Sequence, residues 1–170
     1  PPRPRARRLA RPRRPHVRGV PGILEIARAR DPRTRYAAAS GLAKGGYVLA
    51  DAEGGDPQVL LIGTGSEVAL CVAAADRLRR AGIATRVVSM PSWDRFAAQG
   101  AAFRNRILPA GVPSLSVEAA STFGWERYAT ASVGIDRFGA SAPGGEVLER
   151  LGINVDHVVA RASALVTAKK

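Results

Sequence analysis

The sequence predicts an α/β fold, with an open, mostly parallel mixed sheet and helices on both of its faces. Three observations lead to this prediction. From residue 41 onward, short apolar runs alternate with helical patterns. The run Val59–Gly63 is bounded by turn-forming residues, as is typical of a strand buried on both faces. A glycine turn and a long amphipathic pattern follow it, which together indicate the first half of a βαβ unit.

The amphipathic pattern predicts a helix from about Ser66 to Arg80. Its apolar residues recur at helical spacing, at Val68, Cys71, Val72, Ala75 and Leu78. We expect the side chain of Ser66 or Thr64 to cap its first N–H groups, and Gly82 to end it. Thr85–Ser89 is the next predicted strand. It should lie parallel to Val59–Gly63, because one helix joins the two in a right-handed crossover.

The remaining predicted elements are short and continue the alternation. A strand at Tyr47–Ala50 precedes the buried strand. After Ser89 the sequence predicts helix Trp93–Gln99 capped by Ser92, helix Ala101–Leu108, strand Ser114–Val117, a helical turn at Trp125–Tyr128, strand Ser132–Ile135, a helix from Pro143 through Leu151, and a final helix capped by Asn154. These elements place one α/β domain in residues 41–170.

The formal net charge of +12 is concentrated in the first forty residues. Residues 1–40 hold twelve arginines, seven prolines and only two acids, whereas residues 41–170 hold fourteen basic and twelve acidic side chains. This composition predicts a disordered basic tail. The alternative is a cationic arm that binds nucleic acid through its arginines. Tyr36 is its only aromatic side chain for base stacking, so nucleic-acid binding is the less favoured reading.

The expected compartment is the cytoplasm. A single cysteine, Cys71, excludes an internal disulfide framework and fits a reducing environment. No apolar run approaches the ~20 residues of a membrane span, so we expect no membrane contact. The basic N-terminal stretch lacks the apolar core of a secretory signal.

The glycine turn is the best candidate for a binding site. Its residues Gly63, Thr64, Gly65 and Ser66 precede a helix, whose free N–H groups and dipole could hold an anion. The turn is not a dinucleotide-binding fingerprint, because Val68 stands where the third glycine belongs, and it lacks the lysine of a P-loop. A tight turn with a purely structural role is the favoured alternative.

Other side chains offer little chemistry. Glu118 ends a predicted strand at the edge where α/β sheets bind ligands, although a hydrogen-bonding role is the favoured alternative. Cys71 is expected in the core. His16 and His157 are too scattered to form a metal site, and no serine lies in a G-x-S-x-G elbow. We therefore assign no catalytic, cofactor-binding or metal-binding residue to this chain.

Six blocks in residues 41–166 resemble the C-terminal domain of transketolase, whereas residues 1–40 do not. They are GGYVLAD at Gly45–Asp51, IGTGSEVALCVAAADRL at Ile62–Leu78, RVVSMPSWDRF at Arg86–Phe96, VEAASTFGWERYA at Val117–Ala129, RFGASAP at Arg137–Pro143 and LGINVDHVV at Leu151–Val159. The blocks occur in the family's order. Residues 1–40 are then either the product of a frame shift or a genuine extension.

The resemblance implies a function for the whole enzyme and a restricted role for this chain. Transketolases of the pentose phosphate pathway move a two-carbon ketol unit between sugar phosphates, with thiamine diphosphate and a divalent metal. The family's cofactor and metal sites lie in two other domains. The resemblance thus implies a non-catalytic structural and dimer-assembly module, whose partners are the missing domains or a second subunit. We expect Trp93, Trp125 and the neighbourhood Phe123–Tyr128 to form surface that those partners cover.

Overall fold

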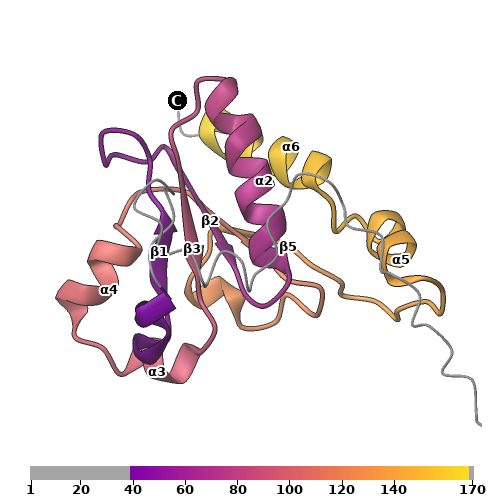
Figure 1. The fold of residues 1–170 in the computed structure, drawn as a ribbon, viewed down its shortest axis with the longest axis horizontal. Helices are drawn as coiled ribbons and strands as arrows, with labels where there is room; N and C mark the ends of the chain where they lie inside the picture. The colour runs from indigo at the N-terminus through magenta and orange to yellow at the C-terminus, as the bar shows by residue number, and fades with distance from the viewer. Residues whose placement is uncertain (1–38, 169–170) are drawn as a thin grey trace, which may run out of the picture.

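The protein's computed structural model describes residues 39–168. Their centre is a five-stranded sheet with the order β1-β3-β2-β4-β5 (Figure 1). The strands are β1 Tyr47–Ala50, β2 Val59–Gly63, β3 Thr85–Ser89, β4 Ser114–Val117 and β5 Ala131–Val133. A 3₁₀ helix, η1 (Ala39–Lys44), precedes them. The predicted basic tail therefore lies outside the described residues, except for residues 39 and 40 at the start of η1.

Strand β2 is the middle strand of the sheet, as its sequence predicts. It pairs in parallel with β3 and β4, so Leu61 lies opposite Val87 on one side and Leu115 on the other. Strand β5 continues the parallel pairing beside β4, whereas β1 runs antiparallel to β3. The prediction of a mostly parallel mixed sheet is confirmed.

The helices cover both faces of the sheet. Helices α2 (Glu67–Arg80) and α6 (Val155–Ala168) pack against each other on one face (Figure 1). The other face is covered by α3 (Trp93–Ala97), α4 (Ala101–Ile107) and the 3₁₀ turn η2 (Trp125–Arg127). Helix α5 (Gly144–Arg150) precedes α6 and has no buried residue.

The strand residues divide between two cores because successive side chains point to opposite faces. Leu61 and Val87 join the core under α2 and α6. Ile62 and Val88 join the core under α3, α4 and η2. All four side chains are fully buried. Burial on both faces explains why β2 is a continuous apolar run rather than an alternating one.

Three predicted helix ends are confirmed. Ser92 Oγ accepts a hydrogen bond from the Arg95 amide at 3.4 Å at the start of α3. Asn154 Oδ1 accepts one from the His157 amide at 2.8 Å at the start of α6. Gly82 follows α2 with a φ of +78°, a left-handed conformation that glycine adopts without a Cβ clash.

Two local predictions are wrong. The Ser66 side chain accepts no bond from the start of α2. Ser66 already has the helical dihedral angles φ −70° and ψ −27° instead of the extended backbone of a capping residue, and its Oγ donates to Glu67 Oε1 at 2.6 Å. The last strand, predicted at Ser132–Ile135, spans Ala131–Val133. The Ile135 amide donates to the Ala120 carbonyl at 2.8 Å, so the chain has left the ladder there.

Candidate functional site

The candidate site is the edge of the sheet at which β2 and β4 end. These neighbouring strands are parallel, so their carboxyl ends meet at one edge. The chain leaves β2 into α2 on one face and reaches β4 from α4 on the other. Open α/β sheets bind their ligands beside strands whose connections diverge in this way. The glycine turn follows β2 and Glu118 follows β4, so the structure places both predicted features at this edge.

The glycine turn is a compact link between β2 and α2. Gly65 has a φ of +52°, which favours glycine. A Cβ on Gly63 would lie 3.0 Å from Cys71 Sγ, so the missing side chain lets α2 approach β2 closely. The amide of Glu67 donates to the Thr64 carbonyl at 3.1 Å, and the amide of Ala69 donates to the Ser66 carbonyl at 3.2 Å. These two amides are therefore used within the turn.

Two carboxylates lie at this edge, and sequence reasoning found only one of them. Glu67, the first residue of α2, is buried, with 5% of its surface exposed. Glu118 is half-buried, and burial followed by the charge of Glu67 raises the pKa of its carboxyl group. A glutamate in a first helical turn suits the helix dipole on any surface helix, so the sequence carried no signal that Glu67 is buried.

The two acids bear on what the edge can bind. The Glu67 carboxylate lies at the positive end of the α2 dipole, which is also the position that a bound anion would use. Anion binding at Gly63, Thr64, Gly65 and Ser66 stays a prediction. Among residues 39–168, no group of three or more histidine, cysteine, aspartate or glutamate side chains is arranged to hold a metal ion.

Cys71 lies in the core, and the exposed side chain of His157 lies against the backbone. Cys71 is fully buried between α2 and the sheet, and burial raises the pKa of its thiol far above the ordinary value. The thiol therefore stays protonated, and the prediction of a core cysteine is confirmed. His157 is exposed, and its Nδ1 lies 2.8 Å from the Gly152 carbonyl oxygen. His16 lies outside the described residues.

Trp125 corrects one prediction. It was expected on a surface that other domains cover, but only 1% of it is exposed. The η2 turn folds over the second face of the sheet and carries the indole into that core. Trp93 is half-buried against it, with ring centroids 5.0 Å apart in an edge-on arrangement. Phe123, in contrast, is 86% exposed, as the prediction for its neighbourhood required.

The two loops after β4 and β5 are joined by one aspartate. Asp136 accepts hydrogen bonds from Ser121 Oγ at 2.9 Å, from the Thr122 amide at 2.8 Å and from Thr122 Oγ1 at 2.7 Å. These bonds, those from Thr122 first, lower the pKa of the carboxyl group. We call Ser121, Thr122 and Asp136 the loop clasp.

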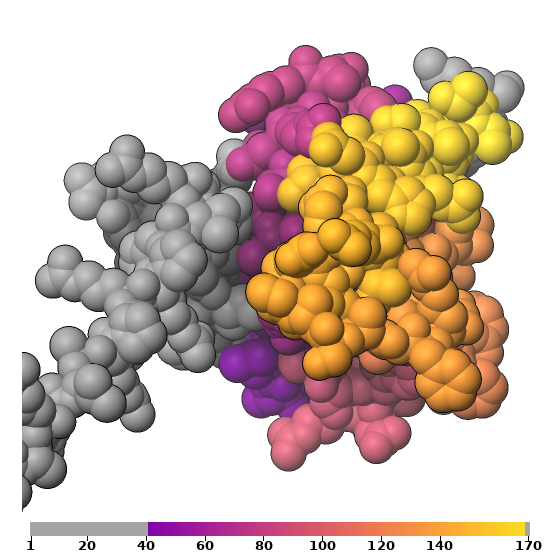
Figure 2. Space-filling view, turned by 90° about the vertical axis from the view of Figure 1, so that its right-hand side faces the viewer, coloured from indigo at the N-terminus to yellow at the C-terminus, as the bar shows by residue number. Residues whose placement is uncertain are grey.

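The clasped loops carry two exposed aromatic rings. Phe123 follows the clasp in the first loop, and Phe138, which is 100% exposed, follows it in the second. Figure 2 views the side of the molecule on which the orange segment of α5 lies next to α6 (yellow). Neither ring is used in packing the described residues.

In the described part of the chain, no helix is long and apolar enough to cross a membrane.

Comparison with known proteins agrees with this fold. Residues 45–154 match the family described as the Transketolase-like TK C-terminal domain. The transketolase of Nostoc sp. is 47% identical over 150 residues, which cover 86% of this chain and 22% of that protein. The chain thus spans about a fifth of the length of this relative.

Solved transketolases share the three-dimensional arrangement. The enzyme from Leishmania mexicana matches with a TM-score of 0.74 and 42% identity, over 78% of this chain and 19% of its own. The enzyme from Pichia stipitis, in its complex with sedoheptulose 7-phosphate, matches with a TM-score of 0.73 and 36% identity, over 81% of this chain and 20% of its own. The family match, the sequence identity and the shared fold agree, and this chain therefore belongs to the transketolase family and contains its C-terminal domain.

Proposed function

We propose that this chain acts as the C-terminal assembly domain of a transketolase, and that it performs no catalysis by itself. In the complete enzyme, the reaction is transfer of a two-carbon ketol unit between sugar phosphates, with thiamine diphosphate and a divalent metal. The observation that carries the proposal is the 47% identity to a transketolase across most of this chain and only 22% of the relative. The sugar phosphate bound to the Pichia stipitis enzyme supports the substrate class.

The chemistry of the reaction supports a non-catalytic role. Ketol transfer requires a cofactor held in its reactive geometry and groups that accept and return protons. The cofactor's diphosphate needs a metal with oxygen ligands. At the candidate edge, Glu67 is buried, and its charge contributes to raising the pKa of the half-buried Glu118. The site's groups thus give no reason to assign cofactor or metal binding to this chain.

The exposed rings of Phe123 and Phe138 support the assembly role. Large aromatic side chains left in water at one place mark a surface that another protein covers. The loop clasp holds the loop of Phe123 to the loop of Phe138, so the docking surface is ordered before a partner arrives. The proposed partners are the remaining transketolase domains of the same subunit or of a second subunit. Trp93, half-buried, and the loop before η2 extend this surface.

We further propose the division of the chain into a basic tail, residues 1–40, and a folded domain, residues 41–170. Limited proteolysis should remove the arginine-rich tail and leave a stable core. Protection of the tail against the protease would contradict the division. A gel-shift assay with full and trimmed protein tests the rival nucleic-acid function, which requires binding that weakens with salt and disappears with the tail.

The runner-up binding function is an anion held by Gly63, Thr64, Gly65 and Ser66. Titration with inorganic phosphate should then shift the amide NMR signals of Gly65, Ser66 and Glu67 first. Shifts confined to the arginine-rich tail would indicate nonspecific ion pairing instead.

A chimera tests the assembly role directly. The C-terminal domain of the Nostoc transketolase would be replaced by residues 41–170 of this chain. We expect the chimera to dimerise and to turn over xylulose 5-phosphate and ribose 5-phosphate, whereas the Nostoc protein truncated before this domain should do neither. This chain alone should show no turnover with the same substrates, thiamine diphosphate and magnesium.

Two variants of the chimera sharpen the test. Phe138→Asp should weaken dimerisation and reduce turnover, because it places a charge in the proposed interface. Arg161→Gln, on the exposed side of α6, is the matched control and should change neither property. Turnover by this chain alone that survives repurification would overturn the proposal, as would a chimera that stays monomeric.

A further inference from the structure

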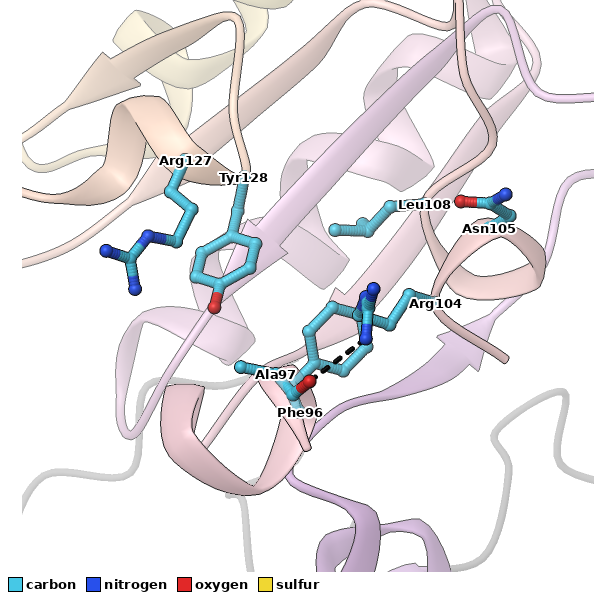
Figure 3. Close-up of a pocket in the computed structure, with 7 residues that line it drawn as sticks. All are labelled: Phe96, Ala97, Arg104, Asn105, Leu108, Arg127 and Tyr128. Carbon is cyan, nitrogen blue, oxygen red and sulfur yellow. Dashed lines mark hydrogen bonds between the residues drawn. The ribbon is translucent and has the colours of Figure 1, made fainter. Parts of the chain in front are cut away.

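A cavity of about 390 Å³ lies on the second face of the sheet (Figure 3). It is the gap that the three short elements α3, α4 and η2 leave between them. Phe96 comes from α3, Arg104 and Asn105 from α4, Leu108 from the residue after α4, and Arg127 and Tyr128 from the end of η2. We call this cavity the α3–η2 pocket.

The most informative atom of the pocket is the hydroxyl oxygen of Tyr128. It is inaccessible to solvent and has no hydrogen-bond partner within residues 39–168. The ring itself is held firmly, because it packs edge-on against Phe96 at 5.7 Å and tilted against Trp93 at 5.8 Å. A buried hydroxyl group almost always has a partner in a folded protein. Because the Tyr128 hydroxyl has no such partner, an acceptor from outside the described residues would satisfy it.

Two arginine side chains line the pocket together with Tyr128. Arg104 Nη1 donates to the Ala97 carbonyl at 2.9 Å and to the Gln99 carbonyl, which fixes the side chain over the end of α3 (Figure 3). A guanidinium has five donors, so these bonds leave Nε and Nη2 for a ligand. Arg127 lies on the other side of the Tyr128 ring in Figure 3, and it forms no ion pair in the part of the chain that the structure describes.

The two charged residues that line the pocket, Arg104 and Arg127, are both cationic. None of its lining residues is acidic. Beside it, Lys44 Nζ and the Arg106 guanidinium lie 4.9 Å and 5.2 Å from the centre of the Phe103 ring, so two more cations are held close to this face. Guanidinium groups bind oxyanions with two parallel hydrogen bonds, and a phenol hydroxyl can add a third donor.

We propose that the α3–η2 pocket binds a small oxyanion, the phosphate or carboxylate group of a small molecule. Arg127 and the free donors of Arg104 contact its oxygens, and the Tyr128 hydroxyl, which is closed to solvent in the free chain, donates to one of them once the ligand displaces the side chains that cover it. Phe96, Leu108 and the Tyr128 ring form an apolar floor against which the remainder of the ligand lies. This site is independent of the assembly role. Its test observes pocket residues, whereas the assembly test measures dimerisation and turnover of a chimera, so either proposal can fail without the other.

The test is a titration of the full chain with inorganic phosphate, followed by amide NMR at constant ionic strength. We expect the signals of Ala97, Asn105 and Tyr128 to shift and to saturate. Constant ionic strength removes the contribution of general screening. Because each residue is observed separately, binding at this pocket is distinguished from ion pairing at the arginine-rich tail.

Variants assign the binding to the named groups. Arg127→Gln should weaken binding about tenfold, the ratio expected for one charge-assisted hydrogen bond. Tyr128→Phe keeps the aromatic ring and should weaken binding severalfold while the protein remains folded. Arg161 lies on α6, which covers the opposite face of the sheet. Arg161→Gln is therefore the matched control and should leave the affinity unchanged. Phenyl phosphate and benzoate then distinguish a phosphate ligand from a carboxylate ligand.

Three results would overturn the proposal. The first is a set of shifts confined to the tail or to the turn before α2. The second is an equal loss of affinity in Arg161→Gln and Arg127→Gln, which would indicate attraction by net charge alone. The third is an absence of saturable shifts at Ala97 and Tyr128 with phosphate, phenyl phosphate and benzoate, which would leave the pocket as an interface that a protein segment fills.

Discussion

Arg86 and Asp51 form a two-pronged ion pair at the side of the sheet where β1 and β3 meet. Arg86 Nε donates to Asp51 Oδ1 at 2.7 Å, and Nη2 donates to Oδ2 at 3.0 Å. The arginine is buried, and Nη1 also donates to the Arg106 carbonyl at 2.9 Å. One side chain thus joins the turn after β1 to the end of α4.

Removal of the carboxylate from this pair should destabilise the domain. Asp51→Ala leaves a buried guanidinium with carbonyl partners only, and we expect a loss of about 2 kcal/mol in the free energy of unfolding. Chemical denaturation measures this change. The control is Glu146→Gln, which breaks the exposed i,i+4 pair with Arg150 and should cost less than about 0.5 kcal/mol. Equal effects of the two variants would show that burial of Arg86 adds nothing.

Truncation of the central strand should be more damaging. Leu61 is fully buried in the middle strand of the sheet, so Leu61→Ala should cost about 3 kcal/mol through lost burial and the cavity that remains. Leu61→Asp should abolish folding, because it buries an unpaired carboxylate. Leu42, 46% exposed, provides the control, and Leu42→Ala should change the free energy of unfolding by less than about 0.5 kcal/mol. A smaller loss for Leu61→Ala than for Leu42→Ala would contradict the central position of β2.

Glu118 should make stability fall as the pH rises. Its pKa is raised in the folded state, so the folded protein holds this proton to a higher pH than the unfolded chain does. The protonated carboxyl group of Glu118 is therefore compatible with the full stability of the fold at acidic pH. This stability is lost as the pH rises above the pKa of the unfolded chain, about 4.3.

The variant Glu118→Gln, which stays neutral, isolates this effect. Its melting temperature should exceed that of the unmodified protein at neutral pH, and the difference should shrink at acidic pH. Thermal melts across pH measure the difference. Glu126→Gln, on the exposed side of η2, is the control and should show no such trend. A difference that grows on acidification would refute the assignment.

Asp136 should have the opposite pH dependence. Its pKa is lowered by the bonds from Thr122 and Ser121, so the loop clasp is complete above the ordinary aspartate value and is lost as the pH falls through the lowered one. Asp136→Asn should mimic the acidic state at neutral pH. Hydrogen exchange at the Thr122 and Phe123 amides should accelerate, whereas Asp94→Asn, at an exposed position of α3, should leave it unchanged. Unaltered exchange in Asp136→Asn would show that the loops are ordered without the clasp.

The regular elements were predictable because their signals are local. The apolar run of β2, the periodicity of α2 and the caps at Ser92 and Asn154 all lie within a few residues of the structure that they specify. Arg86 was not predictable as a buried residue, because Asp51 and the Arg106 carbonyl come from distant parts of the chain.

The candidate site was predictable only in part, for the same reason. Strand order places the glycine turn and Glu118 at one edge. The burial of Glu67 and Trp125 depends on how a turn folds against a sheet face, and neither residue's neighbours in sequence indicate it. The free hydroxyl of Tyr128 likewise exists because three short helical elements leave a gap, which no periodic pattern records.

The packing of α6 on α2 has a consequence for synthesis of the protein. Val158 and Ala162 are fully buried in the core that α2 begins, although more than seventy residues separate them from the apolar face of α2. On the ribosome, the part of α2 that packs against α6 therefore stays uncovered until the last helix has emerged from the exit tunnel. We expect the nascent domain to bind chaperones through α2 during this interval, and a premature stop codon before residue 155 to send the product to proteolysis.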